Sequence, residues 1–309
     1  MLHFLRLIRI PNLVIVALTQ SIIYFYLILP GFKINDIRPT LPIQQFLLFI
    51  LVTVLVTAGG YIINDILDYE VDLINKRDAV ILHKKISLQT ATWLYFSSSA
   101  LGFLLAIYLA FYIHKPELVV LYPIAIGSLF MYSKLLKKMP LAGNLLIAAF
   151  AAGVAGIIGF AEFEGLQQLM EKSPETSLKI FALLGAYMLF AFYSTLFREI
   201  VKDIEDIEGD VSMNFRTLPI LMGIARVKKL AMIFAVSLLL MIVAGGWLAW
   251  PAVNFIGRIV VLPVLLTTGI WSVVKLYQAS NKADFHHVSQ LTKLLMLTGV
   301  LLLLCIKII

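Results

Sequence analysis

The sequence predicts an all-helical membrane protein that crosses the lipid bilayer about nine times. Of its 309 residues, 61% are hydrophobic and only 14% are charged, whereas an ordinary soluble domain carries about 25% charged residues. Apolar runs of about 20 residues, enough to cross a hydrocarbon core of roughly 30 Å as a helix, recur along the whole chain. The runs are apolar on every face and do not alternate, so a β-barrel is disfavoured.

The apolar runs divide the chain into individual spans. The first run follows Arg6 and Arg9, as the apolar region of a signal peptide follows basic residues, but no convincing small-residue cleavage site comes after it. We therefore expect the run to be retained. The whole chain, residues 1–309, is expected to form a single transmembrane domain. The spans are expected near residues 11–30, 43–63, 91–113, 118–136, 141–161, 178–197, 227–250, 257–278 and 289–309.

Lysine and arginine residues are distributed unevenly between the loops. With the N-terminus placed inside, 18 of the 25 fall in inner segments, as in the cytoplasmic loops of membrane proteins generally. Membrane topology therefore accounts for the net charge of +7, and nucleic acid is not expected as a partner. We expect a multi-pass protein, in the inner membrane if the source is bacterial, among membrane lipids. The N-terminus and the active site would face the cytoplasm, and the C-terminus would be external.

Acidic residues gather in two short windows, which together hold 10 of the 18 acids. Each window continues directly from the C-terminal end of an apolar helix, where the helix dipole disfavours negative charge unless a cation compensates it. A bound cation is therefore expected at both windows. The windows contain Asp65, Asp68, Glu70 and Asp72, and Glu199, Asp203, Glu205, Asp206, Glu208 and Asp210.

The two windows share one spacing, D-x-x-D-x-x-x-D. On a continuous helix the three carboxylates of each set would fall within about 60° of one another on one face and would repel each other. Magnesium relieves such repulsion, because it takes oxygen ligands and accepts one or two carboxylates while phosphate oxygens and water complete its shell. The repeated spacing thus predicts a magnesium and diphosphate site. The alternative is a pair of solvated acidic loops with ion pairs on the helix surface.

Basic residues surround both acidic windows. Arginine suits bidentate phosphate contacts and lysine supplies a point charge, so these residues are candidates for binding a leaving diphosphate. Anchoring of helix ends at lipid headgroups is the competing interpretation, and Tyr132 would then belong to the aromatic belt. The candidates are Lys76 and Arg77 after the first window, Arg198 and Lys202 within the second, and Tyr132, Lys134, Lys137, Lys138 and Asn144 between them.

With these motifs, nearly the whole chain resembles the UbiA-type intramembrane prenyltransferase family. The family motif N-D-x-x-D-x-x-x-D matches from Asn64 to Asp72, and its second motif matches from Asp203 to Asp210. The segment Arg9 to Asn12 is similar to the Arg-x-x-Asn entry to the family's first helix, where the arginine faces diphosphate. The resemblance implies nine helices bundled around a central cavity, with magnesium-assisted loss of diphosphate from a prenyl diphosphate donor.

Within the family, the wording of the second window resembles the branch that makes digeranylgeranylglyceryl phosphate. The matching segments are REIVKDIEDIEGD at 198–210, the Thr-Leu-Pro at 217–219 and KKMPLAGN at 137–144. Two departures stand out. The stretch NKRDAVILHKKIS lacks the family's Pro-Ile pair and glycine, which leaves Arg77 as its phosphate candidate. The family's Tyr-x-x-x-Lys pattern is displaced by one residue, because position 136 is leucine and the lysine is Lys137.

The resemblance implies a reaction in which Mg²⁺ helps the diphosphate to leave and an acceptor attacks the allylic cation, with an aspartate as a candidate for taking the acceptor's proton. The expected catalytic residues are Asn64, Asp65, Asp68, Asp72, Asp203, Asp206 and Asp210, and the same set without Asp65 is expected to bind the metal. Diphosphate contacts are expected from Arg9, Asn12, Arg77, Tyr132, Lys134, Lys137, Asn144, Arg198 and Lys202.

The acceptor is left open between two lipid pathways. Geranylgeranylglyceryl phosphate is favoured by the second window, and its phosphate would need a basic pocket such as Lys134, Lys137, Lys138 and Lys202. An aromatic precursor of a quinone is supported only by the breadth of the family. A cation transporter is the rival from another class, since intramembrane carboxylates also mark ion pathways. The spans are, however, almost free of charge in their middles.

Overall fold

The computed structural model describes residues 2–75, 77 and 80–307, so Lys76 lies outside the described residues. Within these ranges nine helices are long and apolar enough to cross a membrane, and the only β pairing consists of two isolated bridges. The prediction of an all-helical fold with nine spans is thus confirmed. The spans cover Ile10–Ile34, Ile43–Leu67, Leu88–Tyr112, Pro116–Lys138, Ala142–Ala161, Pro174–Glu205, Ile224–Ala252, Gly257–Gln278 and Lys282–Cys305.

The sixth and ninth spans differ most from the expected boundaries, for local reasons. The sixth continues eight residues further, to Glu205, and carries Asp203 inside the helix. The ninth begins at Lys282 instead of 289, because Asn281 and Asp284 form a capping box at its start. Polar residues in a helix's first turn lower the hydropathy of the window without preventing the helix.

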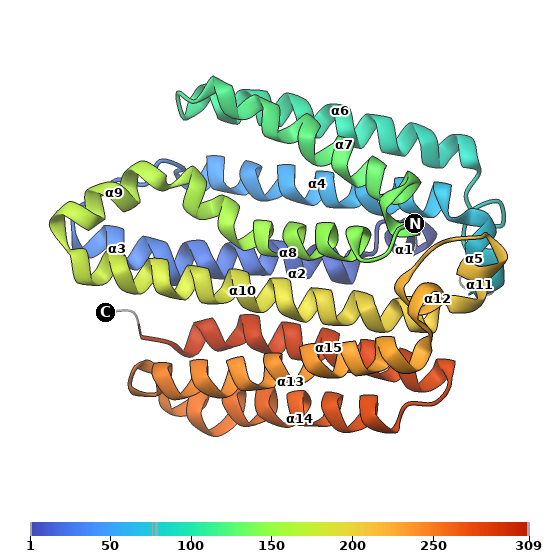
Figure 1. The fold of residues 1–309 in the computed structure, drawn as a ribbon. Coiled ribbons are helices and arrows are strands. Elements are labelled where there is room, and N and C mark those ends of the chain that lie inside the picture. The colour runs from blue at the N-terminus through green and yellow to red at the C-terminus, as the bar shows by residue number, and fades with distance from the viewer. Residues whose placement is uncertain (1, 76, 78–79, 308–309) are drawn as a thin grey trace. The chain divides into compact units, whose positions relative to one another are not determined.

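The residues cluster into two compact units, which we describe separately. The first contains residues 1–18, 40–139 and 208–215. In it, α4 packs against both α6 and α7 (Figure 1). A core around Leu7, Ile62 and Tyr95 supports the end of α4 that carries the first acidic window. Its elements are α1 (Leu2–Leu7), the start of α2 (Ile10–Ile22), α4 (Ile43–Leu67), α5 (Tyr69–Asn75), α6 (Leu88–Tyr112), η3 (Pro116–Val120), α7 (Leu121–Lys134), η4 (Leu136–Lys138) and most of α11 (Ile207–Ser212).

The second unit contains residues 19–39, 140–207 and 216–309 and is built around its longest helix, α10. In Figure 1, α10 lies beside α8, α13 and α15. Its elements are the end of α2, η1 (Ile23–Ile28), α3 (Leu29–Ile34), α8 (Ala142–Ala161), α9 (Phe163–Lys172), α10 (Pro174–Glu205), α12 (Leu218–Met222), α13 (Ile224–Ala249), η5 (Trp250–Ala252), η6 (Gly257–Val261), α14 (Leu262–Gln278), α15 (Lys282–Leu302) and η7 (Leu303–Cys305). The expectation of a single domain stays a prediction.

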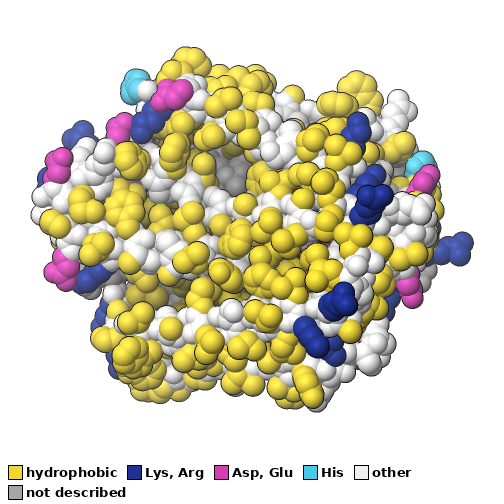
Figure 2. Space-filling model, viewed as in Figure 1, with side chains coloured by type: hydrophobic (Ala, Val, Ile, Leu, Met, Phe, Trp, Pro, Cys, Tyr) yellow, Lys and Arg dark blue, Asp and Glu magenta, His cyan; other side chains and the backbone are white. Residues whose placement is uncertain are grey.

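Large hydrophobic side chains are exposed along the spans. Figure 2 shows such side chains over most of the visible face. Among them, Trp247 is 77% exposed, Leu248 73% and Trp93 68%. Exposing so large an apolar area to water would be unfavourable. Lipid is the solvent that suits this surface, and the chain is therefore an integral, multi-pass membrane protein.

Close packing of α6 against α7 depends on a glycine. The hydroxyl of Tyr122 on α7 donates a hydrogen bond of 2.9 Å to the carbonyl oxygen of Ser99 on α6. A methyl group added at Gly102 would lie 2.9 Å from the ring carbon Cζ of Tyr122 and still closer to its hydroxyl. The absence of a side chain at position 102 lets this hydrogen bond form, as small residues do between membrane helices.

We expect Gly102→Ala to destabilise the protein by about 1–3 kcal/mol, because the ring of Tyr122 must shift and its hydrogen bond is lost. Thermal unfolding in detergent measures the effect as a lowered midpoint. Gly127→Ala is the matched control, since it lies in α7 with nothing within 4 Å of an added methyl group. A Gly102→Ala protein that melts with the control would contradict this account of the helix contact.

Candidate active site

Both acidic motifs have the same local structure, a helix break at the middle aspartate. The first motif crosses from α4 to α5 at Asp68, with φ −94° and ψ 1°. The second crosses from α10 to α11 at Asp206, with φ −94° and ψ 5°. In each case the N–H of this aspartate still donates a 2.8 Å helical bond, to the carbonyl oxygen of Asn64 or of Lys202. The repeated spacing therefore encodes a repeated turn.

This break corrects the expectation that each triad lies on one face of a continuous helix. Asp65 belongs to the last turn of α4, whereas Asp72 belongs to α5. The 100° rotation per residue no longer applies across the turn between them, so the assumption of one continuous helix was wrong. Asp65 and Asp72 nevertheless both line one cavity. Among the described residues, no three His, Cys, Asp or Glu side chains form a group that could hold a metal ion.

The donor chemistry nonetheless fits magnesium bound together with a diphosphate. The motif side chains offer carboxylate oxygens and, at Asn64, an amide oxygen, which are the hard ligands that Mg²⁺ prefers. Mg²⁺ is commonly bound through one or two carboxylates plus substrate phosphates, and does not need a cage made of protein alone. The lack of a three-carboxylate group is consistent with that mode of binding.

Arg9 faces the first motif from the N-terminal segment. Its Nη2 lies 2.6 Å from Oδ1 of Asp65, and its guanidinium lies 4.8 Å from the centre of the Tyr61 ring. Burial opposes the charge of Arg9, but the carboxylates of Asp65 and Asp72 outweigh this effect and raise the pKa of the guanidinium above its ordinary value. Arg9 therefore remains cationic at any pH at which the protein is studied.

The backbone at Arg9 is strained in a way that directs this side chain. Its φ is +54°, the left-handed region that costs a residue with a side chain roughly 1–2 kcal/mol. The kink separates α1 from α2, and the carbonyl oxygen of Arg9 accepts a 2.8 Å bond from the N–H of Asn12. Asn12 in turn donates from Nδ2 to the hydroxyl of Tyr61 at 3.1 Å. Sequence reasoning missed Tyr61, although it lies one turn before Asp65 on α4.

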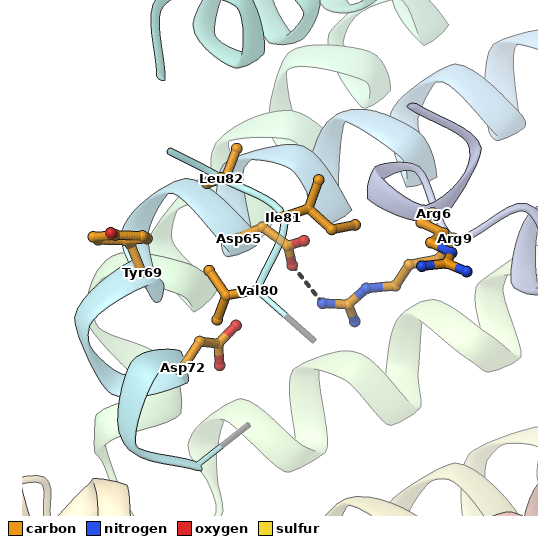
Figure 3. Close-up of a pocket in the computed structure, with 8 residues that line it drawn as sticks. All are labelled: Arg6, Arg9, Asp65, Tyr69, Asp72, Val80, Ile81 and Leu82. Carbon is orange, nitrogen blue, oxygen red and sulfur yellow. Dashed lines mark hydrogen bonds and ion pairs between the residues drawn. The ribbon is translucent and has the colours of Figure 1, made fainter. Parts of the chain in front are cut away.

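A cavity of about 310 Å³ opens beside this ion pair, entirely within the first unit. Figure 3 shows Arg6 and Arg9 reaching it from the N-terminal segment and Asp65, Tyr69 and Asp72 from α4 and α5. Its apolar lining comes from three consecutive residues, Val80, Ile81 and Leu82. Its volume is at the lower end of the range for small-molecule sites. Of the lining residues, Arg6, Tyr69 and the segment 80–82 were not among the predicted site residues. Tyr69 is a variable position of the first motif, and residues 80–82 lie in the stretch that departs from the family pattern.

Lys137 pairs with the middle aspartate of the first motif, Asp68. The one-residue displacement from the family pattern is accommodated because α7 ends at Lys134 and the chain continues as the tight 3₁₀ turn η4. Beside this pair, the hydroxyl of the buried Ser133 donates to Oδ1 of Asn64 at 3.4 Å. The structure thus pairs Lys137 with Asp68 of the first motif and adds Ser133 as a partner of Asn64. The contact of Lys137 with diphosphate stays a prediction.

Four further diphosphate-binding candidates of the first unit lie in different environments. Lys134 is placed over the ring of Phe130, at 5.6 Å, and Lys138 over that of Phe215, at 5.1 Å. Arg77 is exposed, and its carbonyl oxygen accepts a bond from Lys84. Tyr132 is half-buried on α7. None of these four, as the described residues have them, lines the cavity.

In the second unit, Asn144 orients the first aspartate of the second motif. Its Nδ2 donates to Oδ2 of Asp203 at 3.0 Å, from α8 to α10. Helix α8 begins just after Leu141, whose φ of +63° is again left-handed for a bulky residue. Asn144 and Asp203 were both predicted site residues, and the structure brings them together.

Arg198 and Lys202 share a partner that sequence reasoning counted only as one acid among many. Both contact Glu199, whose carboxylate is 2.8 Å from Arg198 and 3.5 Å from Lys202. Glu199 is only 7% exposed, and a buried carboxylate requires such compensation. These two cations therefore have a structural role at Glu199, beside any contact with substrate.

A second side chain in this window is also held by an unpredicted partner. Nδ1 of His286 on α15 lies 2.8 Å from Oε1 of Glu205, and Gln290 is 3.2 Å from the other ring nitrogen. The only signal in the sequence is the spacing of His286 and Gln290, which are neighbours one turn apart on a helix.

The last aspartate of the second motif belongs to the first unit. Asp210 lies in the segment 208–215 and is 8% exposed. The preceding Gly209 donates its N–H to Oδ1 of Asn75, at the end of α5, at 2.9 Å. The unit that carries the first motif therefore also carries Asp210.

Comparisons with known proteins identify relatives of the whole chain. The UbiA prenyltransferase family model matches residues 36–297. A digeranylgeranylglyceryl phosphate synthase from Sulfurisphaera tokodaii is 31% identical over 277 residues, which is 88% of this chain and 90% of that protein.

Solved structures show the same fold. One, described as giving structural and mechanistic insights into the biosynthesis of digeranylgeranylglyceryl phosphate synthase in membranes, matches with a TM-score of 0.62 at 24% identity, over 97% of this chain and 96% of that one. A UbiA homologue from Archaeoglobus fulgidus, bound to GPP and Mg²⁺, matches with a TM-score of 0.52 at 16% identity, over 97% and 99%.

The family match covers most of the chain and contains both acidic motifs. This outcome favours the enzyme over the cation transporter that the sequence left as a rival. The chain belongs to the UbiA prenyltransferase family and is an integral membrane prenyltransferase similar to the digeranylgeranylglyceryl phosphate synthases.

Proposed function

We propose that the protein transfers a geranylgeranyl group from its diphosphate to the free hydroxyl of geranylgeranylglyceryl phosphate, with Mg²⁺ as cofactor. The observation that carries the proposal is the pair of near-identical aspartate turns. Arg9 and Lys137 pair with aspartates of the first, and the amide of Asn144 binds an aspartate of the second. The relatives named digeranylgeranylglyceryl phosphate synthase support the acceptor. The GPP and Mg²⁺ bound by a homologue of the same fold support the donor class and the metal.

The side chains that would hold the metal are Asn64, Asp68, Asp72, Asp203, Asp206 and Asp210. Mg²⁺, when bound with the donor, supplies positive charge that stabilises the departing diphosphate. Lys137 at Asp68 and Arg9 at Asp65 keep cations beside these carboxylates. Lys137 can turn toward phosphate oxygens when Asp68 binds the metal, because that carboxylate no longer needs its ion-pair partner. Arg9 pairs with Asp65, which is not a proposed metal ligand, through one nitrogen and has further N–H donors for phosphate oxygens.

Each side chain beside the aspartates has a separate task. Arg9 presents a planar fork of donors to the diphosphate, and the ring of Tyr61 restricts its orientation. Asn144 holds Asp203 in one rotamer through its 3.0 Å bond. The apolar residues of the segment 80–82 line the cavity and keep water from the allylic cation that forms when the diphosphate leaves.

A transfer assay tests the proposal directly. Purified protein is given radiolabelled geranylgeranyl diphosphate with either geranylgeranylglyceryl phosphate or an aromatic acid, with Mg²⁺ or a chelator. We expect product with the glyceryl phosphate only and none with the chelator. Asp68→Ala and Asp206→Ala are each expected to lower kcat by about 100-fold or more, as loss of a group that stabilises developing charge does.

Glu175→Ala is the matched control for these substitutions, because Glu175 is an exposed acid at the opposite end of α10 and pairs only with Lys179 among the contacts that the structure describes. It should retain wild-type turnover. Product with the aromatic acid alone would assign the protein to quinone synthesis instead. Full activity in both aspartate variants would exclude the mechanism.

A second prediction concerns the shape of the Arg9 side chain. Arg9→Lys keeps the charge but loses the planar fork and the stacking on Tyr61, and Arg9→Gln loses both charge and fork. We expect the KM for the donor to rise in both, by about 10-fold or more in Arg9→Gln and by less in Arg9→Lys, since a hydrogen bond to a charged group contributes about 1.5–3 kcal/mol. Steady-state kinetics at saturating acceptor measures the difference. Equal values for Lys and wild type would show that only the charge matters.

A further inference from the structure

The second motif is divided between the two compact units. Asp203 and Asp206 lie in the second unit, whereas Asp210 lies in the first, within the segment 208–215. Whatever fixes this segment on the first unit therefore also determines where Asp210 is held relative to the first motif.

One side chain makes a direct attachment. Oδ1 of Asn75 accepts a 2.9 Å hydrogen bond from the N–H of Gly209, across 134 residues of sequence. The contact is possible only without a side chain at position 209, because an added methyl group would lie 2.6 Å from Cγ of Asn75. Asn75 would have to move to make room, and its hydrogen bond would break.

Further contacts connect the rest of the segment to this attachment and to Lys138. The hydroxyl of Ser212 donates to the carbonyl oxygen of Gly209 at 2.6 Å. The N–H of Phe215 donates to the carbonyl oxygen of Asp210 at 2.9 Å, and the Phe215 ring lies under the ammonium group of Lys138 at 5.1 Å. A shift at Gly209 is therefore transmitted to Asp210, which directly follows it.

Asn75 also has a fixed relation to the first motif. It lies one helical turn after Asp72 on α5, and residues three apart on a helix are neighbours on its surface. Helix α5 thus carries one aspartate of the first motif itself and holds the last aspartate of the second through Asn75. If Asn75 served only to end α5, the lack of a side chain at Gly209 would have no role in its contacts.

We infer that Asn75 is a positioning residue, which holds Gly209 and so fixes Asp210 beside the helix that carries Asp72. The consequence for metal and diphosphate binding rests on the proposed function, whereas the attachment itself does not. Loss of the attachment leaves every aspartate present but leaves Asp210 less ordered. Weaker binding of Mg²⁺ with diphosphate should follow, with turnover at saturation changed much less.

The test combines hydrogen exchange with kinetics on the full-length protein. In Asn75→Ala and in Gly209→Ala we expect faster amide exchange in residues 207–215. Protection of that segment by Mg²⁺ with inorganic diphosphate should shift to higher Mg²⁺. The Mg²⁺ concentration for half-maximal transfer should rise about 3- to 10-fold, as expected for one lost hydrogen bond, with kcat within about twofold.

Three further variants show whether the effects arise from the hydrogen bond between Asn75 and Gly209. Asn75→Asp keeps an acceptor oxygen and should retain slow exchange. Asn35→Ala removes a comparable 2.9 Å side-chain bond, to the carbonyl oxygen of Gly31 in the other unit, and should leave the Mg²⁺ dependence unchanged. In the double variant, Gly209→Ala should add nothing to Asn75→Ala, because alanine at position 75 leaves room for the methyl group.

Unchanged exchange and Mg²⁺ dependence in both single variants would overturn the inference, as would additive effects in the double variant. The hydrogen-exchange measurement needs no catalysis, so it tests the positioning role of Asn75 independently of the proposed prenyl transfer. Faster exchange and weaker protection in a protein that transfers no prenyl group would support the positioning role of Asn75 and reject the proposed reaction.

Discussion

The structure depends on compensating several carboxylates at the C-terminal ends of two apolar helices. Such ends carry partial negative charge, so each added carboxylate is unfavourable unless a partner is supplied. On α4, Arg9 and Lys137 supply cations to Asp65 and Asp68. On α10, an amide and a histidine serve Asp203 and Glu205, and the buried Glu199 takes two cations. These partners come from five different segments, and their need to meet the two motifs constrains how those segments pack.

The turn at the middle aspartate serves the same end. If the helix continued, three carboxylates would lie on one face without room for cations between them. Because the helix ends at Asp68 and at Asp206, the first and last aspartates of each motif belong to different helices. At the first motif, Arg9 pairs with Asp65 and Lys137 pairs with Asp68. The near-identical dihedral angles at these two residues indicate that the repeated spacing is a property of the turn as much as of the ligand.

The sequence was sufficient for the fold class, the nine spans and the two motifs, because these are long-range regularities of hydropathy and spacing. It was not sufficient where a short local conformation overrides the pattern. Lys137 was thought irregular because it is displaced by one residue from the family's spacing, and in the structure the 3₁₀ turn η4 brings it to Asp68. Tyr61, Ser133 and His286 were missed because each is an ordinary helical residue whose partner lies far away in the chain. Glu199 was counted among the acids of the second window, but the sequence could not show that its side chain is buried between two cations.

Two of the six non-glycine residues with positive φ in the described part of the chain, Arg9 and Leu141, extend this argument to the backbone. Neither is a glycine, and each directly precedes a helix that delivers a site residue, α2 with Asn12 and α8 with Asn144. Strain of this kind persists only where surrounding contacts determine the backbone, and it concentrates at functional sites. At Arg9 the determining contacts are the bonds to Asp65 and to the N–H of Asn12. The same ion pair that compensates a carboxylate therefore also stabilises the kink that aims the arginine, so charge and backbone conformation at this site support each other.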